Sequence, residues 1–472
     1  MKTYDYIMVG NGVAAMVAAS ELARNGRQVL AWNPAPQWGA HFGGLDLAGE
    51  RFDIGMNFLE FTSFAAQCDR PESYSASIRN DSGRFTAVIR RYIEGLVTVV
   101  PTATPTSLYR GIFAPDLVIS NQFALLDLLP EETKTCIRSE LNSCIAAFAA
   151  DSTWHARNKI KDAERFAEAS LERVSLANHG PTLHELLVES CCQRIIGQPS
   201  SAVSALLHRV VWLPIYHPET LLNYLSGSGA ALKQTTFHYP QAGAFAAVIE
   251  ALEKRMASMG GLEVWRDKTL PLTRAGAGWR LGDKAEGKKL VWALRPGQLA
   301  SQFGGTDGHF GLTKSSVGIA FVSIPRECWR RRFSTLLVME KDSPIYRVTD
   351  QSWSAGRVSE AALCTVELSA EMIADWPLHD AAHVAARLLG HLRRLDILDS
   401  SDRVSVRAIR MFKDVIVQPS AANRRKALDE HARVAAGFSD VELIGASAPF
   451  GANSFNDSIV QGLRLGRLAA TH

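Results

Sequence analysis

Hydrophobic positions near the start of the chain predict a strand, a helix and a second strand. Residues 4–9 form a short apolar run rich in β-formers, which is typical of a buried strand. After a glycine-rich turn, apolar residues recur with helical spacing from Val13 to Ala23, and Asn25-Gly26 is a favourable helix end. Residues 28–32 have the pattern of a second strand. This order predicts a β-α-β unit with a parallel sheet.

Further elements of both kinds follow along the chain. An amphipathic helix is predicted after residues 239–243, ending at Gly260-Gly261 before a strand over 262–265. Additional strands are predicted over 290–294, 362–368 and 441–446, and a last helix begins near Ser454. Helices are also predicted over 128–148 and 157–176. The mixture of strands and helices predicts an α/β protein.

The turn after the first strand carries candidate binding chemistry. It has the pattern Gly-x-Gly-x-x-Ala, in which Gly10 permits a tight turn and Gly12 lets a pyrophosphate approach the backbone; Ala15 keeps helix and sheet close. Free amides at the helix start, including those of Val13 and Ala14, would hold the phosphates. This pattern predicts a dinucleotide site but does not distinguish NAD from FAD. A glycine-rich turn of this kind also occurs in α/β proteins that bind no nucleotide.

Composition narrows the class of protein. The 472 residues are 47% hydrophobic and 21% charged, typical of a globular chain with more than one core. Charges balance to 51 − 48 = +3, so no extended basic field for nucleic acid is visible. Seven cysteines without CxxC spacing indicate neither a disulfide framework nor a zinc site, and the adjacent Cys191 and Cys192 are expected in the core. Without a run long enough to span a membrane, we expect a cytoplasmic protein.

Four more segments lie in a recognisable order. They are His41-Phe42-Gly43-Gly44-Leu45, then Phe52-Asp53-Ile54-Gly55, the helix and Gly-Gly strand near residues 239–265, and a C-terminal strand, loop and helix. Together with the first turn they resemble the FAD-dependent amine oxidoreductase superfamily, which includes monoamine oxidases, protoporphyrinogen oxidase and UDP-galactopyranose mutase. The resemblance spans nearly the whole chain.

The resemblance implies a fold and a domain division. It implies an α/β protein in which a Rossmann-like FAD-binding domain is joined to a mixed α+β substrate domain, both discontinuous. The FAD-binding domain would comprise residues 1–61, 238–304 and 412–472, and the substrate domain residues 62–237 and 305–411. The first helix would hold the FAD pyrophosphate, and the start of the last helix would face the flavin ring.

The resemblance also implies which residues contact the cofactor. Besides the residues of the first turn, Asn33 at the end of the second strand would accept hydrogen bonds from the adenosine ribose. The other implied contacts are His41, Gly43, Gly44, Val264, Gly445, Ala446, Asn456, Asp457 and Ser458. Three of these depart from the family pattern. Asn33 stands where an acidic residue is usual, His41 and Leu45 replace arginines, and Gly445-Ala446 lacks the usual acidic residue.

Two residues are candidates for contact with a substrate. Asn57 falls where relatives place a residue facing the flavin or substrate, although it could instead cap the loop. Arg347, before the strand at 362–368, could meet an anionic or carbonyl group of a substrate, or pair structurally with Glu367. No zinc-protease, Walker or nucleophile motif offers a rival apparatus.

The function implied is an FAD-dependent oxidoreductase that oxidises a C–N or C–C bond of a small organic molecule, with oxygen reoxidising the flavin. No metal and no nucleic acid partner are expected. A flavin-dependent mutase without net redox, or a catalytically silent flavin-binding protein, remains an alternative.

Overall fold

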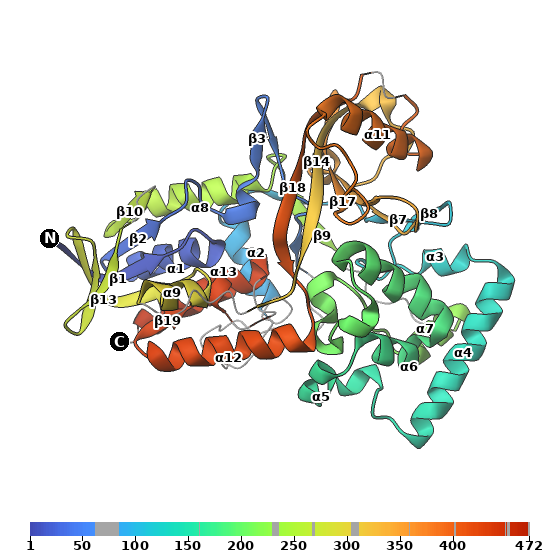
Figure 1. Cartoon of the computed structure of the whole chain (residues 1–472), viewed down its shortest axis with the longest axis horizontal. Coiled ribbons are helices and arrows are strands. Elements are labelled where there is room, and N and C mark those ends of the chain that lie inside the picture. The colour runs from blue at the N-terminus through green and yellow to red at the C-terminus, as the bar shows by residue number, and fades with distance from the viewer. Residues whose placement is uncertain are drawn as a thin grey trace.

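The computed structural model describes residues 1–61, 85–159, 161–228, 236–266, 270–303, 311–357, 359–400, 403–448, 450 and 454–470. Figure 1 shows two halves, with both termini at the far end of one of them. The predicted domain boundaries at residues 62 and 305 fall outside the described residues, and those at 238 and 412 fall within strands Phe237–Pro240 and Ser405–Val417. The division itself stays a prediction.

The first half is built on a seven-stranded sheet. Its five parallel strands follow the order β10-β2-β1-β13-β19, which is the order of a doubly wound dinucleotide fold. The strands are β1 (Lys2–Val9), β2 (Val29–Asn33), β10 (Leu262–Arg266), β13 (Ala285–Trp292) and β19 (Val441–Leu443), with β11 (Leu272–Ala275) and β12 (Gly278–Leu281) antiparallel beside β13.

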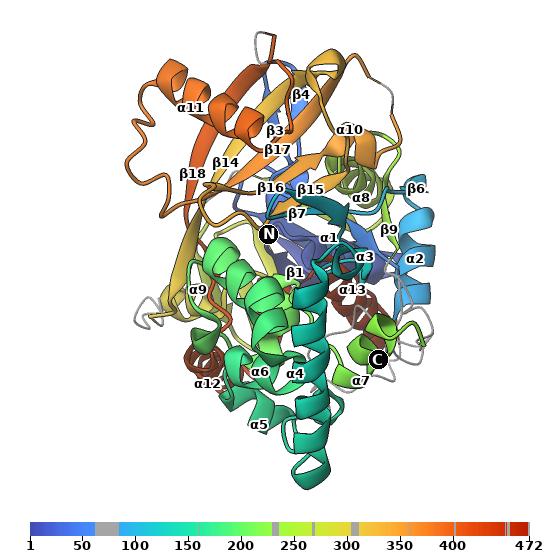
Figure 2. The ribbon, with the colours of Figure 1, turned by 90° about the vertical axis from the view of Figure 1, so that its right-hand side faces the viewer.

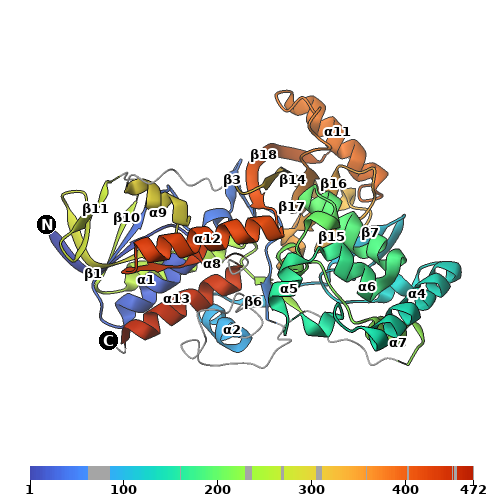
Figure 3. The same ribbon diagram turned by 60° about the horizontal axis from the view of Figure 1, so that its bottom comes forward.

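Helices cover both faces of this sheet (Figure 3). On one face, α9 (Pro296–Gln302) and α12 (Ala421–Gly437) contribute Leu299 and Val434 to a hydrophobic core. On the other face, α1 (Val13–Arg24), α8 (Ala246–Ser258) and α13 (Phe455–Ala470) share a second core. The same hydrophobic core includes Phe85, Ile89 and Ile93 at and within α2 (Thr86–Glu94), a segment that the predicted division places in the substrate half. The apolar stripes predicted for α1, α8 and α13 therefore meet in one core.

The second half combines a mostly antiparallel sheet with a group of helices (Figure 2). The sheet order is β18-β14-β17-β16-β15-β7-β8, from strands β7 (Thr106–Tyr109), β8 (Ile112–Pro115), β14 (Lys314–Pro325), β15 (Thr335–Val338), β16 (Ile345–Asp350), β17 (Ala361–Ser369) and β18 (Ser405–Val417). The helices are α3 (Ala124–Asp127), α4 (Glu131–Ala150), α5 (Ala163–Glu168), α6 (Leu171–His184), α7 (Pro218–Leu225), α10 (Gln351–Ser354) and α11 (Ala381–Arg394).

Short strands connect the two halves. They form the hairpin of β3 (Leu45–Leu47) with β4 (Glu50–Phe52), and a three-stranded sheet of β5 (Leu59–Glu60), β9 (Phe237–Pro240) and β6 (Val99–Pro101).

One predicted helix is wrong. The pattern over 157–176 predicted a single helix, but α5 ends at Glu168 and α6 begins at Leu171. The break occurs because the Ser170 hydroxyl accepts the Arg173 amide as an N-cap, and Leu171 donates its amide to Val203. The charged faces on either side concealed this stop. The expectation that Cys191 and Cys192 lie in the core is confirmed, since both are buried.

Candidate functional site

The turn between β1 and α1 leaves the start of the helix uncapped. Gly10 has a φ of +137°, and a Cβ there would lie 3.0 Å from the Ala293 Cβ, so the position requires glycine. At Gly12 a Cβ would meet nothing within 4 Å, and no side chain caps α1. Among the described residues, no acceptor is found for the amides of Val13, Ala14 and Ala15. These donors and the positive end of the helix dipole are available to an anion beside Gly12.

Helix α13 lies parallel to α1, with its positive end on the same side. A Cβ at Gly462 would lie 2.6 Å from the Val17 Cβ, and one at Gly466 would overlap Glu21. Both pairs advance by four residues in the same direction along the two helices. The two helix starts therefore point the same way, as Figure 3 also shows.

The start of α13 offers fewer free backbone amides than the sequence predicted. Ser454 and Asp457 cap each other, because the Asp457 amide donates to the Ser454 hydroxyl and that hydroxyl donates to the Asp457 carboxylate. The Ser458 amide donates to the Ser454 carbonyl. Of the three predicted donors, Asn456 alone keeps an amide without an acceptor among the described residues, and its side chain donates to the Glu60 carbonyl at 2.9 Å.

The loop after β19 meets the start of α1. Gly445 has a φ of +60°, and a Cβ there would lie 3.3 Å from the Ala14 Cβ. Its amide donates to Gln461 Oε1 of α13 at 2.8 Å, and Ala446 continues into a short turn. The structure thus brings Gly445 and Ala446 to the turn that carries Gly10 and Gly12.

Gly39 is a functional candidate that the sequence analysis missed. Its amide donates to the Asn11 carbonyl at 2.7 Å, within the first turn. Its φ is +84°, and a Cβ would lie 2.6 Å from the Ile249 side chain, so no other residue fits. The only sequence signal was a single glycine between two prolines and the more conspicuous Gly43-Gly44 pair.

The predicted residues Gly43, Gly44 and His41 lie farther along the same loop. A Cβ at Gly43 would lie 2.7 Å from the Trp38 carbonyl oxygen, and Gly44, with a φ of +68°, closely approaches the Phe52 carbonyl. The His41 ring reaches solvent, yet the protein around it desolvates the imidazole and lowers its pKa to about 4. His41 is therefore neutral near pH 7 and does not replace the charge of the arginine usual in the resembled family.

Asn33 uses its side chain to hold its own loop. The residue is fully buried, its Oδ1 accepts the Ala35 amide at 2.8 Å, and its Nδ2 donates to the Gln37 carbonyl at 3.1 Å. The acceptor predicted for a ribose is thus already engaged within the protein.

Arg347 and Glu367 form a buried ion pair between β16 and β17. Nε and Nη2 of Arg347 donate to the two carboxylate oxygens at 2.7 and 2.5 Å, and the side chains are 13% and 5% exposed. The Tyr346 hydroxyl and the Met56 amide donate to the same carboxylate. Burial and the adjacent Glu367 charge raise the pKa of Tyr346, so its phenol stays protonated. The structural pairing weighed for Arg347 is the geometry found.

Asn57 follows directly after this anchored loop. The side chain is buried, and its Nδ2 has no hydrogen-bond partner in the part of the chain that the structure describes. An unpaired buried donor is costly and rare in folded proteins. Asn57 therefore has a free donor for a bound molecule.

A second buried group fixes the other end of the same loop. The Asp53 carboxylate accepts the Tyr239 hydroxyl and, at 2.9 Å, the Phe245 amide at the start of α8. The Asp53 amide donates to Gln351 Oε1 of α10 at 2.9 Å. Burial raises the pKa of Asp53 to about 6, against the opposing effect of its hydrogen bonds. Gln351, which the sequence did not single out, ties the two halves together.

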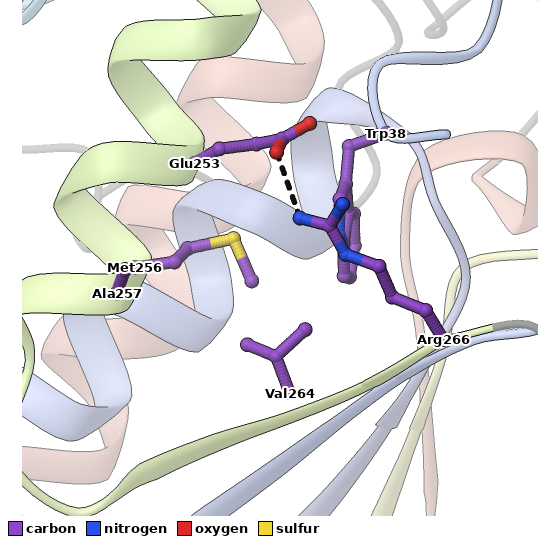
Figure 4. Close-up of a pocket in the computed structure, with 6 residues that line it drawn as sticks. All are labelled: Trp38, Glu253, Met256, Ala257, Val264 and Arg266. Atoms are coloured by element: carbon purple, nitrogen blue, oxygen red, sulfur yellow. Dashed lines mark hydrogen bonds and ion pairs between the residues drawn. The ribbon is translucent and has the colours of Figure 1, made fainter. Parts of the chain in front are cut away.

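A pocket of about 340 Å³ lies between α8 and the edge strand β10 (Figure 4). It is lined by Trp38, Glu253, Met256, Ala257, Val264 and Arg266. Val264, predicted to contact the cofactor, thus faces a cavity. Arg266 and Asn33 are register partners at the ends of β10 and β2. Ligands of open α/β sheets bind at such carboxyl ends of parallel strands.

Comparison with known proteins identifies the fold. No protein-family profile matches the sequence, and no curated protein sequence matches it. Three solved structures illustrate the similarity in three dimensions. A reduced UDP-galactopyranose mutase matches with a TM-score of 0.71 at 13% identity, covering 98% of this chain and 94% of that one. A protein assigned as a protoporphyrinogen oxidase from Exiguobacterium sp. 255-15 matches with a TM-score of 0.63 at 15% identity over 100% and 99%. Putrescine oxidase bound to putrescine matches with a TM-score of 0.56 at 12% identity over 100% and 98%.

These matches confirm the predicted fold class. At this level of identity they establish the architecture alone. Among the described residues, no helix is long and apolar enough to cross a membrane.

Proposed function

We propose that this protein is an FAD-dependent oxidoreductase acting on a small organic substrate. The observation that carries the proposal is the parallel pair of helices α1 and α13, whose positive ends face the same side of a fold shared with flavin-type oxidases and a mutase. The uncapped amides of residues 13–15 and the open space at Gly12 fit a pyrophosphate. The residues present thus fit FAD.

Several residues of this chain would hold the cofactor. Gly10, Gly12 and Gly39 would shape the turn at the pyrophosphate, Gly445 would pack beside that turn against Ala14, and Asn456 would bring a backbone amide toward the flavin end. FAD, when bound, would accept a hydride equivalent from a C–N or C–C bond, and oxygen would be the simplest electron acceptor afterwards. The Asn33 side chain is already hydrogen-bonded within the protein, and the His41 imidazole is neutral. Backbone amides would therefore provide most of the hydrogen bonds to FAD.

The arginine predicted to meet a substrate would offer it no free charge. The Arg347 guanidinium is matched by the Glu367 carboxylate. Asn57 would orient the substrate by donating its free amide hydrogens to an acceptor. No strong base is required if the substrate amine is already neutral.

A flavin-dependent mutase is the second candidate, favoured by the TM-score of 0.71 to UDP-galactopyranose mutase. A nucleotide sugar carries two phosphate charges, which call for unpaired cations. The ion pair of Arg347 with Glu367 leaves that arginine no free charge for a phosphate, which supports the oxidoreductase instead.

The absorbance spectrum of the purified protein tests the proposal. We expect a flavin spectrum that is bleached anaerobically by an amine or by a substrate with an oxidisable ring, and restored by air. Bleaching by dithionite alone, with no candidate substrate effective, would favour the mutase or a catalytically silent flavoprotein. A colourless protein that takes up no FAD would contradict the proposal.

A further inference from the structure

The pocket between α8 and β10 is close to the turn that would hold the pyrophosphate. Trp38 lines the pocket, and the next residue, Gly39, donates its amide to the Asn11 carbonyl at 2.7 Å. Gly12 follows Asn11 directly. The pocket therefore borders the loop that contacts the expected phosphate position, at the ends of strands β2 and β10. This is the side on which the adenosine half of a dinucleotide lies.

A carboxylate is missing from its usual place at the end of β2. In dinucleotide folds an acidic residue there accepts the ribose hydroxyls. Here that position is Asn33, which is uncharged, fully buried and already bonded to Ala35 and Gln37. A ribose beside this chain would need another acceptor.

Glu253 of α8 offers such an acceptor on the pocket wall. Its Oε2 accepts Arg266 Nη2 at 2.7 Å, and Oε1 has no hydrogen-bond partner among the described residues (Figure 4). The side chain is 30% exposed, so the carboxylate remains accessible to a ligand. A charged acceptor for a hydroxyl is stronger than a neutral one.

The other walls fit a purine nucleoside. Trp38, Met256, Ala257 and Val264 provide apolar surface for a base. The Trp38 indole N–H is buried with the residue 1% exposed and has no acceptor within the described residues. The volume of about 340 Å³ lies in the range of roughly 300 to 1,000 Å³ of pockets that hold small organic molecules.

We infer that Glu253, which lies on helix α8, binds the ribose hydroxyls of an adenosine nucleotide. It would do so in place of the acidic residue that dinucleotide folds usually carry at the end of β2. The inference rests on the proposed function in one respect, because it takes the nucleotide to be the adenosine end of FAD. Arg266 would hold the Glu253 carboxylate in place.

The experiment pairs a change in the protein with a change in the ligand. Wild type, Glu253→Gln and Glu286→Gln are titrated with FAD by flavin fluorescence, and ADP and 2′,3′-dideoxy-ADP are used as competitors. Glu286 is a matched control, since it forms an ion pair with Arg280 on the same sheet at a similar exposure of 33%, against 30% for Glu253. For wild type and Glu286→Gln we expect ADP to compete about tenfold better than its dideoxy analogue.

For Glu253→Gln we expect this preference to vanish and FAD affinity to fall by a similar factor. A Glu253→Gln protein that retains the preference would overturn the inference while leaving the proposed function intact. A wild-type protein that takes up no FAD, yet binds ADP more tightly than dideoxy-ADP in direct calorimetric titrations, would overturn the proposed function and support the adenosine site. Circular dichroism checks that each variant is folded. We expect Glu253→Gln to fold, because the Glu253 side chain is partly exposed.

Discussion

Replacement of Glu367 by glutamine tests how strongly its buried ion pair with Arg347 stabilises the second half of the protein. The carboxylate accepts hydrogen bonds from Arg347 Nε and Nη2, the Tyr346 hydroxyl and the Met56 amide. Glutamine keeps one oxygen and turns an NH₂ group toward donors that need an acceptor. It also leaves Arg347, only 13% exposed, without its counter-charge.

The expected cost follows from burial. Removing one partner of a buried ion pair costs about 3–5 kcal/mol of unfolding free energy, because the remaining charge stays desolvated. Replacing Arg347 as well, as in Arg347→Met with Glu367→Gln, should cost much less than the single change, because no unpaired charge stays buried and the glutamine oxygen can still accept from Tyr346 or Met56. The double variant would lose both the attraction and the desolvation penalty.

The pair formed by Arg280 and Glu286 is the natural control. It is also a cross-strand pair, between β12 and β13, but its side chains are 45% and 33% exposed. Glu286→Gln should cost under about 1 kcal/mol. Urea unfolding followed by far-ultraviolet circular dichroism at neutral pH measures all three variants. Equal losses for Glu367→Gln and Glu286→Gln, or a double variant as unstable as Glu367→Gln, would refute the reasoning.

Three further predictions follow from backbone contacts and one buried acid. Gly12→Ala adds a methyl where nothing lies within 4 Å, so we expect an unchanged melting temperature but FAD affinity lower by at least about tenfold in fluorescence titration. Gly462→Ala, 2.6 Å from Val17, should lose about 1–3 kcal/mol in urea unfolding. The control Gly390→Ala, in open space within a helix, should gain about 0.5–1 kcal/mol, and losses in both would contradict the packing argument. Asp53, whose pKa is raised to about 6, binds its proton more tightly in the folded state, so unfolding free energy should fall as pH rises from about 4 to about 6. Asp53→Asn should flatten that slope in urea midpoints measured across this range; an unaltered slope would assign the effect elsewhere.

The local elements were predictable because their signals are local. The strand and helix periods around Gly10 and Gly12 predicted β1, α1 and β2, and the last helix was predicted from its apolar spacing. The break at Ser170 was missed because helical spacing continues across it, while the bonds that interrupt it involve Val203. A local stretch of sequence cannot predict a hydrogen bond to a residue that lies this far along the chain.

The candidate site was predictable in part for the same reason. A glycine required by its own φ and turn, such as Gly10, has a motif around it. Gly39 is required by the side chain of Ile249, a contact that exists only after α8 has packed. Likewise, Gln351 accepts a hydrogen bond from Asp53, 298 residues away in the sequence. Nothing in the local sequence around either residue predicts this contact.

The loop that leads to Asn57 shows how the two halves depend on each other. Gln351 accepts the Asp53 amide, and Glu367 accepts the Met56 amide, so two residues of the second half bind the two ends of the segment 53–56. Both acceptors are buried, and a lost partner would leave an amide unsatisfied. The position of Asn57 therefore depends on elements some three hundred residues away in the chain. A substitution in strands β16 and β17, far from the glycine-rich turn, should therefore shift Asn57, the residue proposed to contact a substrate.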